Sequence, residues 1–306
     1  MTVPTPNVHR TLLAIGPFVI LGGAIVLLFV AFPFDEIETL AGADPLAILW
    51  LVTVVGAIAG IVPVTIGMLW YPFLRTLSTR WIDAVLALSA GVLSFAGMEM
   101  VFGIIDNTAH APVRGGLIAI GGMVVAFGIL IFVREWRSRA LTQGEQASGL
   151  QAAYIIAFGL GLHSIGEGLA IGTAFMQGDG RLVALLVVAF LLDNVTEGPT
   201  IVAAIAREVE SPRLHHFILL GVIAGSPVII GGWIGSLATT ALIAALFFAI
   251  GLGAILEVIW EVIRFIGANN GGRVTAAFSP LNLGTYVIGF LIMVVIDAVV
   301  IDMFLL

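Results

Sequence analysis

Cysteine is absent from this chain of 306 residues, and so is lysine. Without cysteine the protein cannot form disulfides, and it offers no thiolate metal ligand and no cysteine nucleophile. All twelve basic residues are arginines, only 10% of the chain is charged, and the formal net charge is -7. The sequence contains no basic patch, so it gives no support for nucleic acid as a partner.

Apolar residues dominate the composition. They make up 60% of the chain, and the mean hydropathy is +1.17. Soluble domains of this length do not have such a composition, so the sequence predicts an all-α, polytopic membrane helix bundle. The 37 glycines agree with this prediction, because small residues let transmembrane helices pack closely.

The hydropathy pattern predicts about nine transmembrane helices, each with the roughly 20 apolar residues needed to cross the hydrocarbon core. We expect them at 10–32, 45–74, 80–105, 114–137, 150–176, 181–206, 212–237, 239–266 and 282–306. The N-terminal one is long enough to span, and we expect it to be kept as a span rather than removed as a cleavable signal. The loops are short, so we expect residues 1–306 to form a single transmembrane domain.

The arginines predict the orientation of these spans. If the N-terminus is cytoplasmic, Arg114 and Arg181 fall outside and all the other arginines fall on the inside. Basic residues are enriched in cytoplasmic loops. We therefore expect a multi-pass protein of the cell (plasma) membrane, with the N-terminus in the cytoplasm and the C-terminus outside.

Two related polar motifs interrupt long apolar segments near their middle. In each motif a polar residue is followed four positions later by glutamate and then glycine. Positions i and i+4 share a helical face, so His163 and Glu167 form one patch, and Asp193 and Glu197 form another. Ionisable groups at mid-membrane depth are costly and mark functional sites. Imidazole with carboxylates and no sulfur suits a divalent transition-metal ion.

Further carboxylates are expected inside other spans. Glu99 lies in the third predicted span, Glu257 and Glu261 share a face of the eighth, and Asp297 lies in the ninth. We expect no arginine at the same depth, so this negative charge would need cations or protons. Glu99, Glu257 and Glu261 are therefore candidates for a transport pathway, with the last two near the cytoplasmic exit. A purely structural role for each of them stays open, and so does direct binding of a metal ion by Glu257 and Glu261.

Helix breakers lie beside the motifs. Pro199 cannot donate a backbone hydrogen bond, which deprives the Val195 carbonyl of its usual partner. Gly168 and Gly198 let neighbouring helices approach, and Pro227 predicts a kink in the seventh predicted span. Bent helices and freed carbonyls at mid-membrane depth are how transporters build ion sites.

The first motif and the residues after it resemble a known family. Residues 163–172 read His-Ser-Ile-Gly-Glu-Gly-Leu-Ala-Ile-Gly. This is similar to the His-Asn-x-Pro-Glu-Gly-x-Ala-Ile-Gly motif of the ZIP (Zrt-, Irt-like) metal transporters. The second motif resembles that family's next metal-binding helix, and residues 253–261 resemble its penultimate helix. Nine spans, with one before the usual eight, match the prokaryotic members.

The resemblance implies a homodimeric carrier of divalent metal ions, without enzymatic activity. The ion would be a substrate bound between two central helices, with zinc the first candidate and Fe(II), Mn, Co and Cd as others. The family's ligands map onto His163, Glu167, Asp193 and Glu197.

The chain departs from the family pattern at several positions. Ser164 stands where the family often has asparagine, and Asn194 stands where it usually has aspartate. We expect these two residues to be weak additional ligands. Ser226 aligns with a carboxylate in the seventh span of members that bind two metals, so we expect one well-formed metal site, with Ser226 on the transport pathway.

Two other classes of function stay open. An intramembrane metalloenzyme is the first, although the chain lacks both His-Glu-x-x-His and paired Glu-x-x-His motifs. A proton- or sodium-coupled carrier of an organic solute is the second, with the carboxylates as coupling sites. His163 and Glu167 could also be a buried pair that only holds two helices together. The repeat of the spacing on the next span favours the metal site.

Overall fold

The computed structural model of this chain describes residues 45–71, 78–143, 149–205 and 212–305, and a few positions between 15 and 26. Every regular element in these ranges is helical, and eight helical segments are long and apolar enough to cross a membrane. The predicted all-α membrane bundle is confirmed. The elements are α3 (Pro45–Gly56), η2 (Ala57–Ile61), α4 (Val62–Met68), α6 (Thr79–Thr108), α7 (Pro112–Gln143), α8 (Gly149–Met176), α9 (Gly180–Ile205), α10 (Leu214–Gly225), α11 (Pro227–Gly235), α12 (Ala241–Asn269), η3 (Val274–Phe278) and α13 (Pro280–Leu305).

The eight spans agree with the last eight that hydropathy predicted, to within a few residues at most ends. The largest differences are at two C-terminal ends: the span predicted at 45–74 ends at Met68, and the span predicted at 282–306 ends at Val299. The predicted N-terminal span at 10–32 lies almost wholly outside the described residues, so it stays a prediction. The orientation in the membrane likewise stays a prediction.

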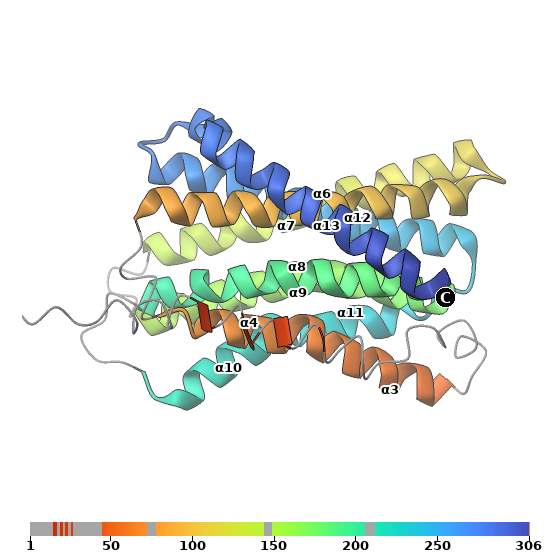
Figure 1. Cartoon of the computed structure of the whole chain (residues 1–306), viewed down its shortest axis with the longest axis horizontal. Helices are drawn as coiled ribbons and strands as arrows, with labels where there is room; N and C mark the ends of the chain where they lie inside the picture. The colour runs from red at the N-terminus through yellow and green to blue at the C-terminus, as the bar shows by residue number, and fades with distance from the viewer. Residues whose placement is uncertain are drawn as a thin grey trace, which may run out of the picture.

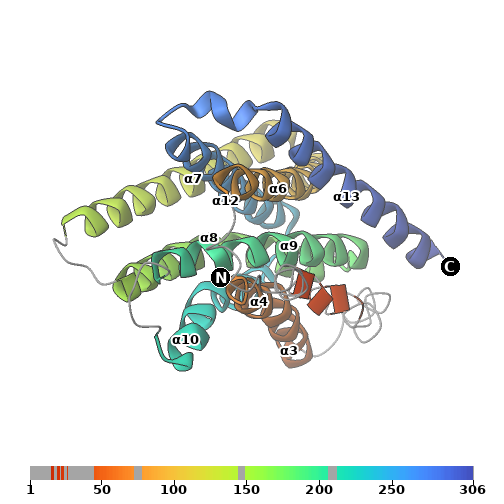
Figure 2. The ribbon, with the colours of Figure 1, turned by 60° about the vertical axis from the view of Figure 1, so that its left-hand side comes forward.

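The helices form two layers. The first, called the motif layer here, contains α3–η2–α4, α8, α9 and α10–α11, and the second, the support layer, contains α6, α7, α12 and α13. Figures 1 and 2 both show α6, α7, α12 and α13 on one side of α8 and α9, with α4 and α10 on the other. The layers meet where α12 packs on α8 and where α6 and α13 pack on α9.

Two names are used for the ends of the bundle. At the Arg181 end, α6 and α8 finish and α9 begins, and at the Arg264 end, α9 and α12 finish.

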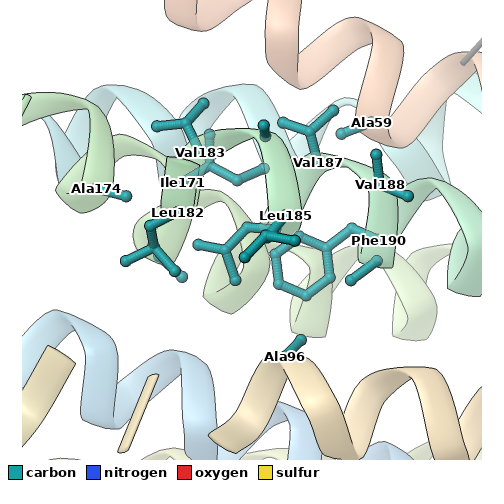
Figure 3. Close-up of a cluster of buried hydrophobic side chains, with 14 of the residues drawn as sticks. Ala59, Ala96, Ile171, Ala174, Leu182, Val183, Leu185, Val187, Val188 and Phe190 are labelled. Atoms are coloured by element: carbon teal, nitrogen blue, oxygen red, sulfur yellow. The ribbon is translucent and has the colours of Figure 1, made fainter. Parts of the chain in front are cut away.

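Helix α9 occupies the centre of the molecule. The rest of the chain buries 83% of its most apolar stretch, against 11% for α7 and 17% for α13. Figure 3 shows α9 between Ala59 of the motif layer and Ala96 of the support layer. A polar group on α9 is therefore removed from lipid and can be satisfied only by protein, water or an ion.

Two spans of the motif layer are broken near their middle. In the first, a π-helical turn, η2, separates α3 from α4. In the other, α10 ends at Gly225 and α11 starts at Pro227, so the span is interrupted where the sequence predicted a kink. The breaks adjoin each other, because a Cβ on Gly60 would lie 2.3 Å from the carbonyl oxygen of Gly225.

Glycines bring the motif helices into backbone contact. A Cβ at Gly168 would lie 2.0 Å from Val228 O on α11. On α4, a Cβ at Gly67 would lie 2.1 Å from Val195 O, the carbonyl that Pro199 leaves without its helical partner. Neighbouring helices thus approach at the two motifs, as the glycines predicted, and fix where the polar residues meet.

Candidate functional site

His163 of α8 and Glu197 of α9 face each other across the interface between the two motif helices. His163 Nε2 lies 2.6 Å from Glu197 Oε1, and both side chains are buried. The two motifs therefore form one site, although these residues are 34 positions apart in the sequence. Each motif contributes through the helical face that the spacing predicted.

Asn194 joins Glu167 to the first described span. Its Nδ2 group donates to Glu167 Oε2 at 3.0 Å and to the Ala59 carbonyl at 3.1 Å. Ala59 lies in the π-helical turn η2, and such turns occur frequently at functional sites. Because both contacts use the amide nitrogen, the Asn194 oxygen is left as the unoccupied end of this side chain.

Asp193 has a partner that sequence reasoning missed. Ser89 of α6, in the support layer, donates its hydroxyl to Asp193 Oδ1. Thr196 donates at 2.7 Å to the Asp193 carbonyl and lies 3.2 Å from the Ser89 hydroxyl. A single serine in an apolar span carries no motif, so nothing in the sequence singled out Ser89.

Three oxygens of this site are buried without a hydrogen-bond partner in the described part of the chain. They are Asp193 Oδ2, Asn194 Oδ1 and Glu197 Oε2, all on α9. A buried polar atom without a partner is costly, and such atoms are rare in folded proteins. Oxygens of this kind beside an imidazole match the ligand chemistry of a divalent transition-metal ion.

In this structure the candidate ligands form hydrogen bonds with one another or with a neighbouring serine. Within the described residues, no three His, Asp or Glu side chains converge as a coordination shell requires. Instead His163 pairs with Glu197, Asn194 with Glu167, and Ser89 with Asp193. An arriving ion would replace these hydrogen bonds with metal–ligand bonds.

Ser164 and Ser226 were expected to matter through the resemblance alone. Ser164 is fully buried, and its hydroxyl donates to the Leu160 carbonyl of its own helix at 3.1 Å. Ser226 lies at the break between α10 and α11. Their expected roles stay predictions.

A cavity of about 70 Å³ adjoins the site toward the Arg264 end. His163, Asp193 and Glu197 form its inner wall, and Glu261 and Phe265 of α12 line it farther along. This cavity therefore reaches three of the ligand candidates and extends from the site toward the Arg264 end.

Glu257 and Glu261 have different surroundings despite their i, i+4 spacing. Glu261 lines the cavity, whereas Glu257 is not among its lining residues. Glu257 Oε1 accepts a hydrogen bond from Arg134 Nη1 of α7 at 3.0 Å.

Glu99 lies toward the Arg181 end, where Arg181 of α9 binds it together with Asp297 of α13. We expected no arginine at the depth of these carboxylates, and that expectation is wrong. Arg134 and Arg181 begin near the ends of spans, and their long side chains reach the buried acids. The charges of Glu99 and Glu257 are therefore compensated by protein.

Together these features define a class: an all-α, multi-pass membrane bundle with a buried histidine–carboxylate site between its two central helices. No family model matches the chain. It is 25% identical over 150 residues to the zinc transporter ZIPB of Bordetella bronchiseptica. The match covers 46% of this chain and 48% of that protein, so the chain spans about half the length of the curated relative it matches. This match supports the resemblance to the ZIP family.

Proposed function

We propose that this protein is a secondary carrier of divalent transition-metal ions and that it belongs to the ZIP family. The observation that carries the proposal is the group of unpartnered oxygens of Asp193, Asn194 and Glu197 beside the His163 imidazole. These atoms lie inside spans, where a bound cation is the simplest compensation. The ligands are His163, Glu167, Asp193 and Glu197, with Asn194 and Ser164 in support.

Zinc is the first candidate substrate. The chain offers one imidazole and several carboxylates and has no thiolate, a donor set that zinc accepts. The name of the Bordetella relative agrees with that choice. Fe(II), Mn, Co and Cd fit the same donors, so the order among these metals has to be measured.

The transport route follows from the cavity and the proposed orientation. With the N-terminus in the cytoplasm, the Arg264 end faces inward, and the cavity beside Glu261 becomes the release path. The ion would enter from the Arg181 end, bind between α8 and α9, and leave into the cell. The carrier would act in the cell membrane as a homodimer.

The size of the cavity favours an ion over an organic solute. Sites for small organic ligands commonly have volumes of about 300–1,000 Å³. The cavity that reaches the motif residues has about 70 Å³, which suits an ion with a few water molecules. The same volume argues against an intramembrane enzyme that acts on a large substrate.

Uptake into proteoliposomes that contain a metal-sensitive dye tests the proposal. Zn, Mn, Fe(II) and Cd should be compared for the wild type and for Glu167→Ala/Glu197→Ala. We expect saturable flux that the double substitution abolishes. Glu135→Ala is the control, because the Glu135 side chain on α7 is 45% exposed, lies away from the site and pairs with Arg264 and Arg134.

No flux of any of the four metals by folded protein would overturn the carrier. If that protein still binds one ion per chain, a metalloenzyme or a sensor becomes the better reading. Sodium-dependent uptake of an organic solute, without metal flux, would support the other class of carrier.

A further inference from the structure

Side-chain bonds cross between the two layers at two levels. At the candidate site, Ser89 of the support layer donates to Asp193 of the motif layer. At the Arg181 end, Arg181 of α9 binds Glu99 of α6 and Asp297 of α13. The second group lies on the side of the site opposite to the cavity that Glu261 lines.

The guanidinium of Arg181 binds two carboxylates at the same time. Nη1 lies 3.2 Å from Glu99 Oε2 and Nη2 lies 3.4 Å from Glu99 Oε1. Nε lies 3.0 Å and Nη2 lies 2.7 Å from Asp297 Oδ1. The planar fork of arginine is suited to such bidentate contacts. One residue of the motif layer is thereby tied to two helices of the support layer.

The ion pairs border a polar cavity at this end of the bundle. It has about 600 Å³, and Asp106 and Asp179 line it together with the three paired residues. Arg181 is 34% exposed there, whereas Glu99 is only 9% exposed. The ion pairs of Arg181 therefore face the polar cavity on one side and the protein interior on the other.

An apolar plug separates these ion pairs from the candidate site. Between Glu99 and Ser89, α6 contributes Phe95 and Val92 to a buried hydrophobic cluster. Between Arg181 and Asp193, α9 contributes Leu185 to the same cluster. Figure 3 shows part of this cluster along α9, with Ala96 of α6 facing it. Buried apolar side chains lie between the site and the Arg181 end, whereas a cavity adjoins the site toward the Arg264 end.

We propose that Arg181 is an ion-pair latch between the layers. Bound to Glu99 and Asp297, it holds the bundle shut at the Arg181 end while the site communicates with the cavity at the Arg264 end. Release of the latch lets α9 separate from α6 and α13 and exposes the plug. The inference rests on the proposed function, because such a latch has a task only if the site opens to each end in turn.

A second arginine–glutamate pair between helices provides a control. Arg134 Nη1 and Glu257 Oε1 lie 3.0 Å apart, and both side chains are largely buried. This pair joins α7 to α12, which belong to the same layer. Its loss removes a buried ion pair of similar length without cutting a tie between the layers.

Because the chain has no cysteine, a single introduced cysteine reports the solvent accessibility of its own position through its rate of labelling. Ala96→Cys places one thiol in the plug, and Thr200→Cys places one in the wall of the cavity at the Arg264 end. Each is labelled with a membrane-impermeant thiol reagent, applied in separate arms to each side of proteoliposomes with sided insertion. The backgrounds are wild type, Arg181→Gln, Glu99→Gln/Asp297→Asn and Arg134→Gln.

We expect either change in the latch to speed labelling at position 96 from the Arg181 side by about tenfold and to slow labelling at position 200, because a population shift moves the two in opposite directions. Arg134→Gln should leave both rates within about twofold. If Arg181→Gln fails to fold, the Glu99→Gln/Asp297→Asn variant, which keeps the arginine, decides the question.

Unchanged rates in the latch variants, or an equal change in Arg134→Gln, would overturn the latch. Metal flux is measured separately on the wild type. Its absence would count against the carrier, whereas the labelling rates report the latch itself.

Discussion

His163 Nε2 and Glu197 Oε1 lie 2.6 Å apart, each inside a different motif helix. A hydrogen bond between these two atoms contains a proton, on the imidazole or on the carboxyl group. A metal ion bound to the same two atoms has to replace that proton. In the proposed carrier, the pair would therefore couple metal binding to proton release.

Metal binding should release about one proton per ion at neutral pH. Since protons compete with the metal for these atoms, affinity should rise with pH, by up to about tenfold per unit for each proton released. Isothermal titration in buffers of different ionisation enthalpy measures the proton count. His163→Gln should lower that count together with the affinity, and pH-independent binding by the wild type would contradict the coupling.

Loss of a motif carboxylate should weaken metal binding much more than loss of the carboxylate that Arg134 holds. We expect Glu167→Gln and Glu197→Gln to lower affinity by about 100-fold or more, since even indirect partners of metal ligands contribute about 10–100-fold. Glu257→Gln should change it by less than about tenfold. Equal affinities of wild type and Glu167→Gln by calorimetry would rule out this site.

Ser89 should act on the metal through Asp193. Its hydroxyl holds one oxygen of that carboxylate, so Ser89→Ala frees the carboxylate to rotate and should lower affinity by about tenfold. Ser94→Ala is the control, because Ser94 on the same helix donates only to the Ala90 carbonyl of that helix at 2.8 Å. An equal loss in both variants would show a general effect on α6.

The wild type should bind one metal ion per chain. Asn194 and Ser226 lack the charge that a second site would need, and their segments adjoin through Ala59, Gly60 and Gly225. Asn194→Asp/Ser226→Glu should therefore raise the stoichiometry toward two. Metal analysis after dialysis measures both proteins. Two ions per wild-type chain would contradict the single site.

A methyl group should be costly where α8 meets α11. At Gly172 a Cβ would lie 2.1 Å from Gly232 O, which is backbone and cannot move aside alone. Gly172→Ala should lower the thermal midpoint in detergent, with a cost of about 1–3 kcal/mol typical of overpacking. Gly128→Ala on α7 meets no atom within 4 Å and should be tolerated. Equal midpoints would show that the helices adjust.

Much of the site could be predicted because helical spacing is a local property. The i, i+4 rule placed His163 and Glu167 on one face, and Asp193 and Glu197 on another, before any packing was known. The same rule failed to separate Glu257 from Glu261, since a shared face does not say which neighbour each side chain meets. The role of Ser89 could not be predicted for the same reason, because it depends on which helix lies opposite.

Composition and the helical period of the sequence were enough to predict a membrane protein and the eight spans in the described part of the chain. They also predicted which residues of each motif share a helical face. Hydropathy and the 3.6-residue period are properties of a single helix, so they can be recognised in the sequence before the packing of the helices is known. The tertiary structure decided which faces meet. Helix packing brought His163 to Glu197 and Arg181 to Glu99 and Asp297. Long arginine side chains reach from one span to another. The sequence of a single span therefore does not predict which carboxylate such an arginine contacts.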